Sequence, residues 1–277
     1  MAVMSHVEIG VSDLTRAAEF YGGLLGFAED GARSGGDTLV MAAGAATVRL
    51  VEVGHDATPS GWSPDDLQRG FRHFGMKVDA VDARLAVLED AGVPVRLRPL
   101  DAAGGVRIAF FADPDGTHLE FVAGQLRYDP VWSPALVAEE EAGLHNGWDG
   151  TPRFDHVAVT VDDLDRALGY YRDTLGIPVL GQLDHRATDE RGFVITYLRA
   201  GETVIEVFSF RADTAPGPWR PAPDLLGIRS VGLTVPDPAA ARAALTAAGG
   251  TALTRPGARP VELVADGDQL VAELVRA

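Results

Sequence analysis

The apolar residues of this chain recur with two periods, one typical of helices and one typical of strands. Near the start, a short alternating run is followed by a stripe at helical spacing, which predicts a helix over residues 14–25. Ser12 or Asp13 can cap this helix, and Gly26 can end it in the left-handed conformation. The stripe returns 150 residues later, and we expect both copies to be core. Its members are Leu14, Ala17, Ala18, Tyr21 and Leu25, then Leu164, Ala167, Leu168, Tyr171 and Leu175.

Four copies of one unit follow each other along the chain. Two strong copies begin at Ser5 and Asp155, and two weaker copies begin at Arg72 and Arg229. Each copy opens with an alternating strand and a helix and continues with three strand-like runs. The pattern therefore predicts an α+β protein built from four βαβββ modules.

A predicted hairpin over residues 106–122 carries the most distinctive polar residues. Residues 113–116 read Asp-Pro-Asp-Gly, the residue types that a type I turn prefers at successive positions. Because side chains alternate along a strand, His118 and Glu120 lie on one face and Leu119 on the other. The hairpin thus places a carboxylate beside an imidazole.

The connections between the units suggest how the units pair. Residues 54–70 and 209–227, which join the first unit to the second and the third to the fourth, share a P-G-W-P-D-L skeleton. We therefore predict that the first unit pairs with the second and the third with the fourth. The predicted domains are residues 1–125 and 153–277, joined by a linker of residues 126–152 with a short helix from Pro134.

Composition narrows the range of partners. The formal net charge is −16, the wrong sign for neutralising phosphates, so we expect neither nucleic acid nor an anionic membrane as partner. The chain has no Cys, which excludes disulfides, thiolate metal sites and a thiol nucleophile. No apolar run is long enough to span a bilayer. These features predict a cytoplasmic protein, a monomer or homodimer, with a small-molecule substrate.

Histidine and glutamate recur at matching places near the start and end of the units. Two such units, paired about a pseudo-twofold axis, would bring two imidazoles and two carboxylates to one point, which is a site for Zn, Ni, Co, Mn or Fe. Pairing of the second unit with the third would complete a different set from the predicted one. The pairs are His6 with Glu52, His73 with Glu120, His156 with Glu206, and Ser230 with Glu273.

These motifs resemble those of the vicinal oxygen chelate superfamily, which includes glyoxalase I, extradiol dioxygenases and the fosfomycin- and bleomycin-resistance proteins. The similar segments are the H-V-x-(V/I)-x-V-x-D-L start, the Tyr…Leu-Gly helix end and the D-P-D-G-T-H-L-E-F hairpin. The resemblance implies paired βαβββ modules that curve into cup-shaped mixed sheets around a divalent metal. It implies the glyoxalase I ligand pattern His, Glu, His, Glu at His6, Glu52, His73 and Glu120.

Departures from the family pattern favour the N-terminal half as the location of the metal site. Ser230 stands where the C-terminal half should carry its second histidine, and a hydroxyl is a poor ligand. Ring-cleaving members carry a Tyr where this chain has Phe110. We therefore expect the metal in the N-terminal domain and a degenerate site in the C-terminal one.

Three functions are compatible with this sequence. The first is a glyoxalase I-like isomerase or lyase, in which the metal polarises two adjacent substrate oxygens, while Glu120 or Glu52, or the neighbouring Glu8, moves a proton. The second is an Fe(II) extradiol-type dioxygenase with two histidines and one carboxylate. The third is a non-enzymatic protein that sequesters an antibiotic or other small molecule, with Trp62 and Trp219 over the pocket.

Overall fold

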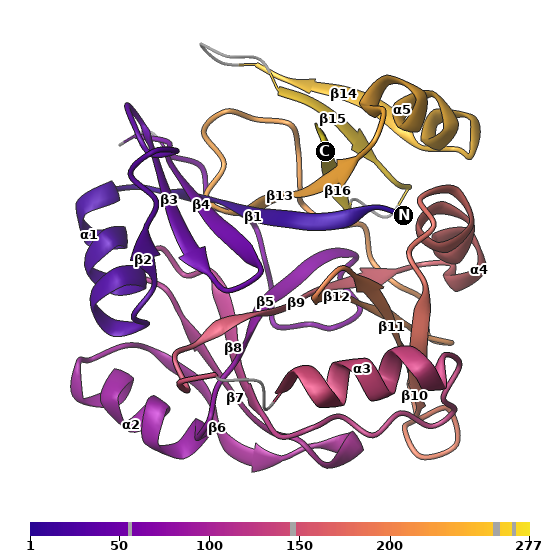
Figure 1. Ribbon diagram of the computed structural model, residues 1–277, viewed down its shortest axis with the longest axis horizontal. Coiled ribbons are helices and arrows are strands. Elements are labelled where there is room, and N and C mark those ends of the chain that lie inside the picture. The colour runs from indigo at the N-terminus through magenta and orange to yellow at the C-terminus, as the bar shows by residue number, and fades with distance from the viewer. Residues whose placement is uncertain (55–56, 145–147, 257–260, 268–269) are drawn as a thin grey trace.

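The computed structural model describes the whole chain except residues 55–56, 145–147, 257–260 and 268–269. It contains two eight-stranded mixed sheets with few flanking helices, which confirms the predicted α+β class. Helices α1 (Leu14–Ala18) and α2 (Val81–Asp90) lie on one side of the molecule, and α4 (Leu164–Leu168) and α5 (Pro238–Ala247) lie on the other (Figure 1). In the described part of the chain, no helix is long and apolar enough to cross a membrane.

The elements follow the predicted βαβββ order four times. Module 1 contains β1 (Val3–Val11), α1 (Leu14–Ala18), the π-helical turn η1 (Glu19–Leu24), β2 (Ala28–Glu29), β3 (Thr38–Ala43) and β4 (Ala46–Glu52). Module 2 contains β5 (Gly70–Lys77), α2 (Val81–Asp90), β6 (Val95–Asp101), η2 (Ala103–Gly105), β7 (Arg107–Ala112) and β8 (His118–Ala123). The helix α3 (Pro134–Leu144) follows, close to its predicted place.

The second half repeats this arrangement. Module 3 contains β9 (Arg153–Val161), α4 (Leu164–Leu168), η3 (Gly169–Thr174), β10 (Val179–Asp184), β11 (Val194–Ala200) and β12 (Thr203–Ser209). Module 4 contains β13 (Gly227–Val235), α5 (Pro238–Ala247), β14 (Thr251–Arg255), β15 (Val261–Ala265) and β16 (Val271–Arg276).

The first helix shows how the local sequence sets its limits. Asp13, rather than Ser12, is the N-cap, because its side chain accepts a hydrogen bond from the backbone N–H of Arg16. Gly26 ends the helical segment at a φ of 81°, in the left-handed region that glycine tolerates best. Tyr21 is fully buried, as the stripe predicts, and its hydroxyl donates to Asp113 of module 2 at 3.0 Å.

The pairing of the modules differs from the prediction. β1 pairs with β13, which joins modules 1 and 4 in one sheet, here called sheet 1/4. β5 pairs with β9, which joins modules 2 and 3 in the other, sheet 2/3. The expected pairing of modules 1 with 2 and 3 with 4 is therefore wrong. The boundaries drawn at residues 126 and 152 stay a prediction about units of sequence.

The two similar connections explain why the prediction of pairing was wrong. They lie beside each other and form parallel bridges, Thr58 with Leu225 and Gln68 with Ala215. Each connection runs from a strand of one sheet to a strand of the other. The long segment between modules 2 and 3 instead joins two modules of the same sheet. The likeness of the short connections thus reflects their mutual contact.

Candidate metal centre

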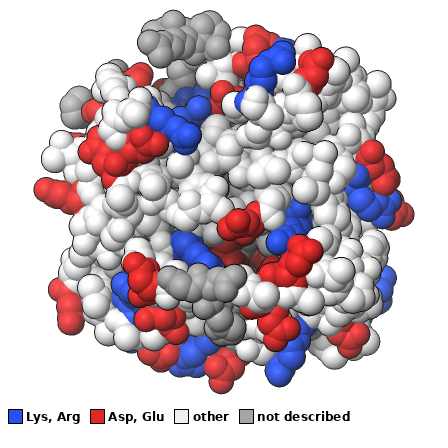
Figure 2. All heavy atoms as spheres, viewed as in Figure 1, with Lys and Arg blue, Asp and Glu red and all other residues white. Residues whose placement is uncertain are grey.

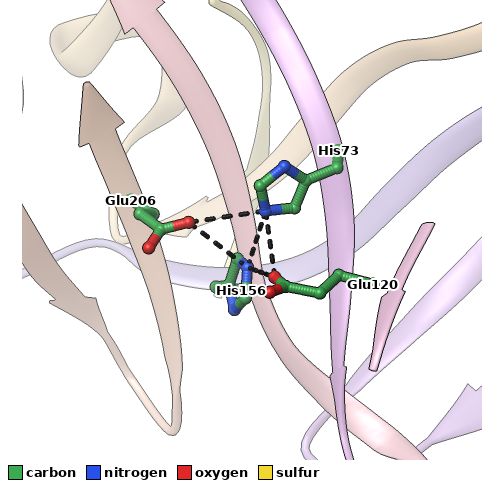
Figure 3. Close-up of side chains that lie close together, drawn as sticks. All are labelled: His73, Glu120, His156 and Glu206. Atoms are coloured by element: carbon green, nitrogen blue, oxygen red, sulfur yellow. Dashed lines mark hydrogen bonds and ion pairs between the residues drawn. The ribbon is translucent and has the colours of Figure 1, made fainter. Parts of the chain in front are cut away.

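Four ligand-type side chains from sheet 2/3 meet at one point (Figure 3). They come from the central strands β5 and β9 and from the adjoining strands β8 and β12, and their ligand atoms all lie within 4.8 Å of one another. All four side chains are buried. The residues are His73, Glu120, His156 and Glu206.

The distances within this cluster fit a divalent ion. Nε2 of His73 lies 3.1 Å from the nearer oxygen of Glu120, and Nε2 of His156 lies 2.9 Å from it. Each Nε2 lies 3.4 Å from the nearer oxygen of Glu206, and the two Nε2 atoms are 3.0 Å apart. With metal–ligand bonds of about 2.0–2.2 Å, neighbouring ligands of one ion lie roughly 3.0–3.5 Å apart. The ligand atoms can therefore surround an ion without backbone movement.

The electrostatics of the cluster also favour a cation. Burial by itself would raise the pKa of Glu120, but hydrogen bonds to His156 and His73 lower it to about 2. Burial would lower the pKa of His73, yet hydrogen bonds to Glu120 and Glu206 raise it. The two buried carboxylates therefore stabilise a positive charge located between the four side chains. A proton on an imidazole supplies that charge in part, and a divalent ion supplies it in full.

Residues outside the cluster hold His156 in place. Nδ1 of His156 lies 2.9 Å from a carboxylate oxygen of Asp155, which places the proton on Nδ1 and turns Nε2 toward the cluster. Asp155 is itself paired with Lys77 at 3.5 Å. Gly75 provides the space for the ring, because a Cβ at this position would lie 2.1 Å from His156 Cε1.

Sheet 1/4 carries a second set of residues at the same positions. Glu206 lies two residues beyond the strand partner of His156, and Arg49 lies two residues beyond the strand partner of His6. An arginine therefore replaces one carboxylate ligand. By register, His6 corresponds to His156, Arg49 to Glu206, Ser230 to His73 and Glu273 to Glu120.

The guanidinium of Arg49 supplies the positive charge in this second set. It contacts Glu8 at 2.6 Å and also pairs with Glu273. The other oxygen of Glu8 pairs with Arg229 at 3.3 Å and with Arg255. Because an internal cation already neutralises these carboxylates, and because a serine replaces one histidine, this set does not fit a metal ion.

The fold does not assemble the predicted ligand set. His73 and Glu120 belong to the cluster, but His6 lies in sheet 1/4, with Nε2 at 3.4 Å from Glu273. Glu52 is exposed at the end of β4. The set left open for a pairing of modules 2 and 3 is the one that the structure brings together. The C-terminal half therefore does contribute ligand-type residues to the cluster, since His156 and Glu206 come from it.

Glu8 and Glu52 do not reach the cluster that would contain the reacting atoms. Glu8 is only 2% exposed and is surrounded by three arginines in sheet 1/4. Glu52 has the same parity along β4 as the buried Val48 and Leu50, so it lies on the opposite face from Arg49. The predicted acid–base roles of Glu8 and Glu52 are therefore corrected, and Glu120 remains as the candidate.

A cavity of about 1470 Å³ adjoins the cluster, and two groups of aromatic rings are among its lining residues. In the first group, Trp62 lies against His118 at a tilt of 30° with ring centroids 4.4 Å apart, and His118 stacks on Phe110 at 4.8 Å. In the second group, Tyr128 and Tyr197 are in edge contact at 5.1 Å. The face shown in Figure 2 is hollowed near its centre, with acidic and basic side chains around the hollow.

The two linker tryptophans have different surroundings. Trp62 lines the cavity, as the hypothesis of a pocket residue requires. Trp219 donates its indole N–H to the backbone oxygen of Arg229 at 2.8 Å and packs against the buried Leu263 group of sheet 1/4. Only Trp62 is therefore placed to contact a ligand beside the cluster.

Comparison with known proteins identifies the family of this chain. Residues 3–121 and 153–266 match the family model of the Glyoxalase/Bleomycin resistance protein/Dioxygenase superfamily. The chain belongs to this superfamily. The resemblance found in the motifs is thereby confirmed.

Several named proteins are similar in sequence to this chain. The anthracycline biosynthesis protein DauV of Streptomyces sp. (strain C5) is 28% identical over 183 residues, 61% of this chain and 59% of that protein. Lactoylglutathione lyase of Schizosaccharomyces pombe is 30% identical over 118 residues, 43% of this chain and 33% of the enzyme. The chain thus aligns with 59% or less of the length of these relatives.

Solved structures of the superfamily share the fold over nearly the whole chain. Glyoxalase I from Zea mays has a TM-score of 0.69 at 20% identity, covering 100% of this chain and 92% of that one. A putative dioxygenase from Bacillus subtilis has a TM-score of 0.60 at 14% identity, covering 99% and 84%. At these identities the likeness establishes the fold alone.

Proposed function

We propose that this protein is a divalent-metal-dependent enzyme of the glyoxalase I kind, an isomerase or lyase that acts on a small substrate with two adjacent oxygen atoms. The observation that carries the proposal is the buried set of two imidazoles and two carboxylates beside a large cavity. The family supports it, as does the similarity to proteins named lactoylglutathione lyase. The ligand types suit Zn, Ni, Co, Mn or Fe.

The number of protein ligands favours this chemistry over oxygen chemistry. Four protein ligands leave two positions of an octahedron, which is enough for two adjacent oxygens of a substrate. A ring-cleaving dioxygenase uses three protein ligands, because a catechol and dioxygen together need three positions. Phe110 stands where ring-cleaving members have a Tyr, which also argues against a ring-cleaving reaction.

The bound metal would supply Lewis acidity toward the two substrate oxygens. The chain itself would move the proton. A carboxylate of the cluster, for which we propose Glu120, would take a proton from one carbon of the substrate, hold it, and return it to the neighbouring carbon. The aromatic rings around the cluster would keep water away while the carboxylate holds the proton. No electron leaves or enters the substrate in this sequence, as isomerase and lyase reactions require.

The non-enzymatic alternative has lost its main support. It depended on vestigial ligands in the C-terminal half, but His156 and Glu206 complete a full set with His73 and Glu120. The residues of sheet 1/4 that do look vestigial lie in a separate cluster. We therefore favour catalysis over small-molecule sequestration as the function.

Metal analysis followed by activity measurement tests the proposal. Purified protein, dialysed against each candidate ion, should retain about one ion per chain. The variants His156→Ala and Glu206→Gln should lose it, whereas Glu52→Gln should keep it. The loaded protein should isomerise hemithioacetals of 2-oxoaldehydes with glutathione or with simpler thiols. A wild-type protein that binds none of the ions, or that binds a ligand equally well after chelation and converts no substrate, would refute the proposal.

A further inference from the structure

The charged side chains of sheet 1/4 form a cluster of their own, here called the arginine cluster. Ion pairs link three guanidinium groups to two carboxylates, so positive charge exceeds negative charge by one. The candidate metal centre of sheet 2/3 has two carboxylates and two imidazoles instead, and it attracts a cation. The members of the arginine cluster are Glu8, Arg49, Arg229, Arg255 and Glu273. The two sheets therefore present sites of opposite sign.

The arginine cluster lies mostly inside the protein. The side chains of Glu8, Arg229 and Arg255 are no more than 5% exposed. The side chains of Arg49 and Glu273 are each a little more than one-fifth exposed, so an ion from solution can approach past them. A surplus positive charge in a protein interior is unfavourable unless a negative charge compensates it.

Several hydrogen-bond donors beside this surplus charge are unpaired. Ser230 is fully buried, and its hydroxyl has no hydrogen-bond partner among the residues that the structure describes. Because Ser230 lies directly opposite Glu8 on the neighbouring strand, its side chain is on the same face of the sheet as the arginine cluster. One terminal nitrogen, Nη1, of Arg229 and of Arg255 is also buried without a hydrogen bond. All these groups can donate, so the partner that would satisfy them is an acceptor.

We propose that the arginine cluster binds a small oxyanion. Its oxygens would accept hydrogen bonds from the hydroxyl of Ser230 and from the free N–H groups of Arg229 and Arg255, and its charge would offset the surplus positive charge. The planar fork of a guanidinium group matches both carboxylate and phosphate oxygens. A serine hydroxyl is a poor metal ligand but a good donor to such an anion. The inference does not depend on the proposed function.

Glu8 leaves room for this role of the arginines. Its oxygens contact Nε of Arg229, Nη2 of Arg255 and Nη2 of Arg49. Each guanidinium group has five N–H donors, so these contacts use only part of what the three arginines offer. The negative charge of Glu8 nevertheless repels a second anion and weakens its binding. Removal of that charge is therefore expected to tighten the site.

Titration with simple oxyanions tests the proposal. Metal-free full-length protein is titrated with inorganic phosphate and, separately, with acetate, at an ionic strength held constant with sodium chloride. Calorimetry should show saturable binding of about one anion per chain, and the melting temperature should rise with anion concentration. Tighter binding of phosphate would identify a tetrahedral ligand, and tighter binding of acetate a planar one. Absence of saturable binding of both anions would overturn the inference.

Ser230→Ala removes a donor that makes no hydrogen bond within the protein. The variant should be at least as stable as the wild type without anion, yet bind the anion about 10- to 100-fold more weakly. The matched control is Ser133→Ala, because the hydroxyl of Ser133 donates to the backbone oxygen of Val179 at 2.6 Å. The control should lose stability and keep its anion affinity. Unchanged anion affinity in Ser230→Ala would contradict the proposed site.

Glu8→Gln should bind phosphate at least about 10-fold more tightly than the wild type, because it lacks the repelling charge. Phosphate should also restore part of the stability that this variant loses. Weaker phosphate binding by Glu8→Gln would count against the inference.

Two further variants locate the bound anion. His156→Ala, which lacks a ligand of the candidate metal centre, should bind phosphate like the wild type. Arg186→Gln, which removes an exposed arginine paired with Asp184, should also bind it normally. Loss of phosphate binding in His156→Ala would place the anion at the metal centre, and loss in Arg186→Gln would indicate general attraction to surface charge. Either result would overturn the assignment, whereas failure of the protein to bind metal would refute only the proposed function.

Discussion

Replacement of Glu8 by glutamine removes one negative charge from the middle of a buried cluster of arginines. One oxygen of Glu8 faces Arg229 at 3.3 Å and also pairs with Arg255, and the other faces Arg49 at 2.6 Å. The side chains of Glu8, Arg229 and Arg255 are all within a few per cent of full burial. The substitution keeps the size of the side chain, so its effect is mainly electrostatic.

The expected loss of stability follows from these contacts. At an effective dielectric constant of about 20, two unit charges 3.3 Å apart attract by about 5 kcal/mol, before the cost of burying them is subtracted. Removal of one partner from a buried ion pair costs about 3–5 kcal/mol, because the remaining charge stays in the interior without compensation. We expect Glu8→Gln to lower the free energy of unfolding by that amount. The melting temperature should fall by about 10 °C.

Chemical denaturation measures the change, and Glu52→Gln is the matched control. Glu52, a predicted ligand before the fold was known, is exposed, so its substitution should change stability by no more than about 0.5 kcal/mol. Both variants should keep the metal content and the turnover of the wild type. A Glu8→Gln protein with unchanged stability and lost turnover would refute this reasoning and restore Glu8 as an acid–base group.

Three further outcomes are expected. Gly75→Ala should weaken metal binding by about 10- to 100-fold in a metal titration, because its methyl group displaces the His156 ring; unchanged affinity would contradict the close packing. The double variant Arg49→Glu with Ser230→His should bind a second metal ion per chain, detectable by elemental analysis, whereas retention of a single ion would show that register does not define the second set. Burial raises the pKa of Asp113 from 3.8 to about 6, so the protonated carboxyl favours the folded state. This contribution is fully present below pH 3.8 and is lost as the pH rises through 6. Relative to the wild type, Asp113→Asn should therefore gain about 2 kcal/mol between pH 4 and pH 7 in denaturation curves, and parallel pH profiles would refute this.

Local patterns in the sequence were reliable guides to local structure. The helical stripe around Tyr21, the cap at Asp13 and the left-handed end at Gly26 all follow from spacing and residue type, and the structure has each of them. The hairpin that presents Glu120 is also present, with the turn at residues 113–116 between β7 and β8. These features depend on neighbours in the chain, which the sequence displays directly.

Glu52, the carboxylate ligand predicted in module 1, shows that matching by residue type and approximate position was not sufficient. Glu52 was matched to Glu206 by its residue type and approximate position. Strand alternation contradicts the match, because Glu52 shares its parity with Leu50, a core residue, whereas Arg49 lies on the opposite face, at the position that corresponds by register to Glu206. Strand alternation would have shown in advance that Arg49 occupies the position of Glu206, and therefore that module 1 lacks a carboxylate there.

The sequence by itself determined the four modules, their elements and the supply of imidazoles and carboxylates, since each of these depends on periodicity over a few residues. Only the tertiary structure decided that β5 meets β9 and that β1 meets β13. Repeated modules present similar strand edges, so no local pattern distinguishes one partner from another. The choice depends on how the connections and helices pack together, and it brings His156, rather than His6, to His73.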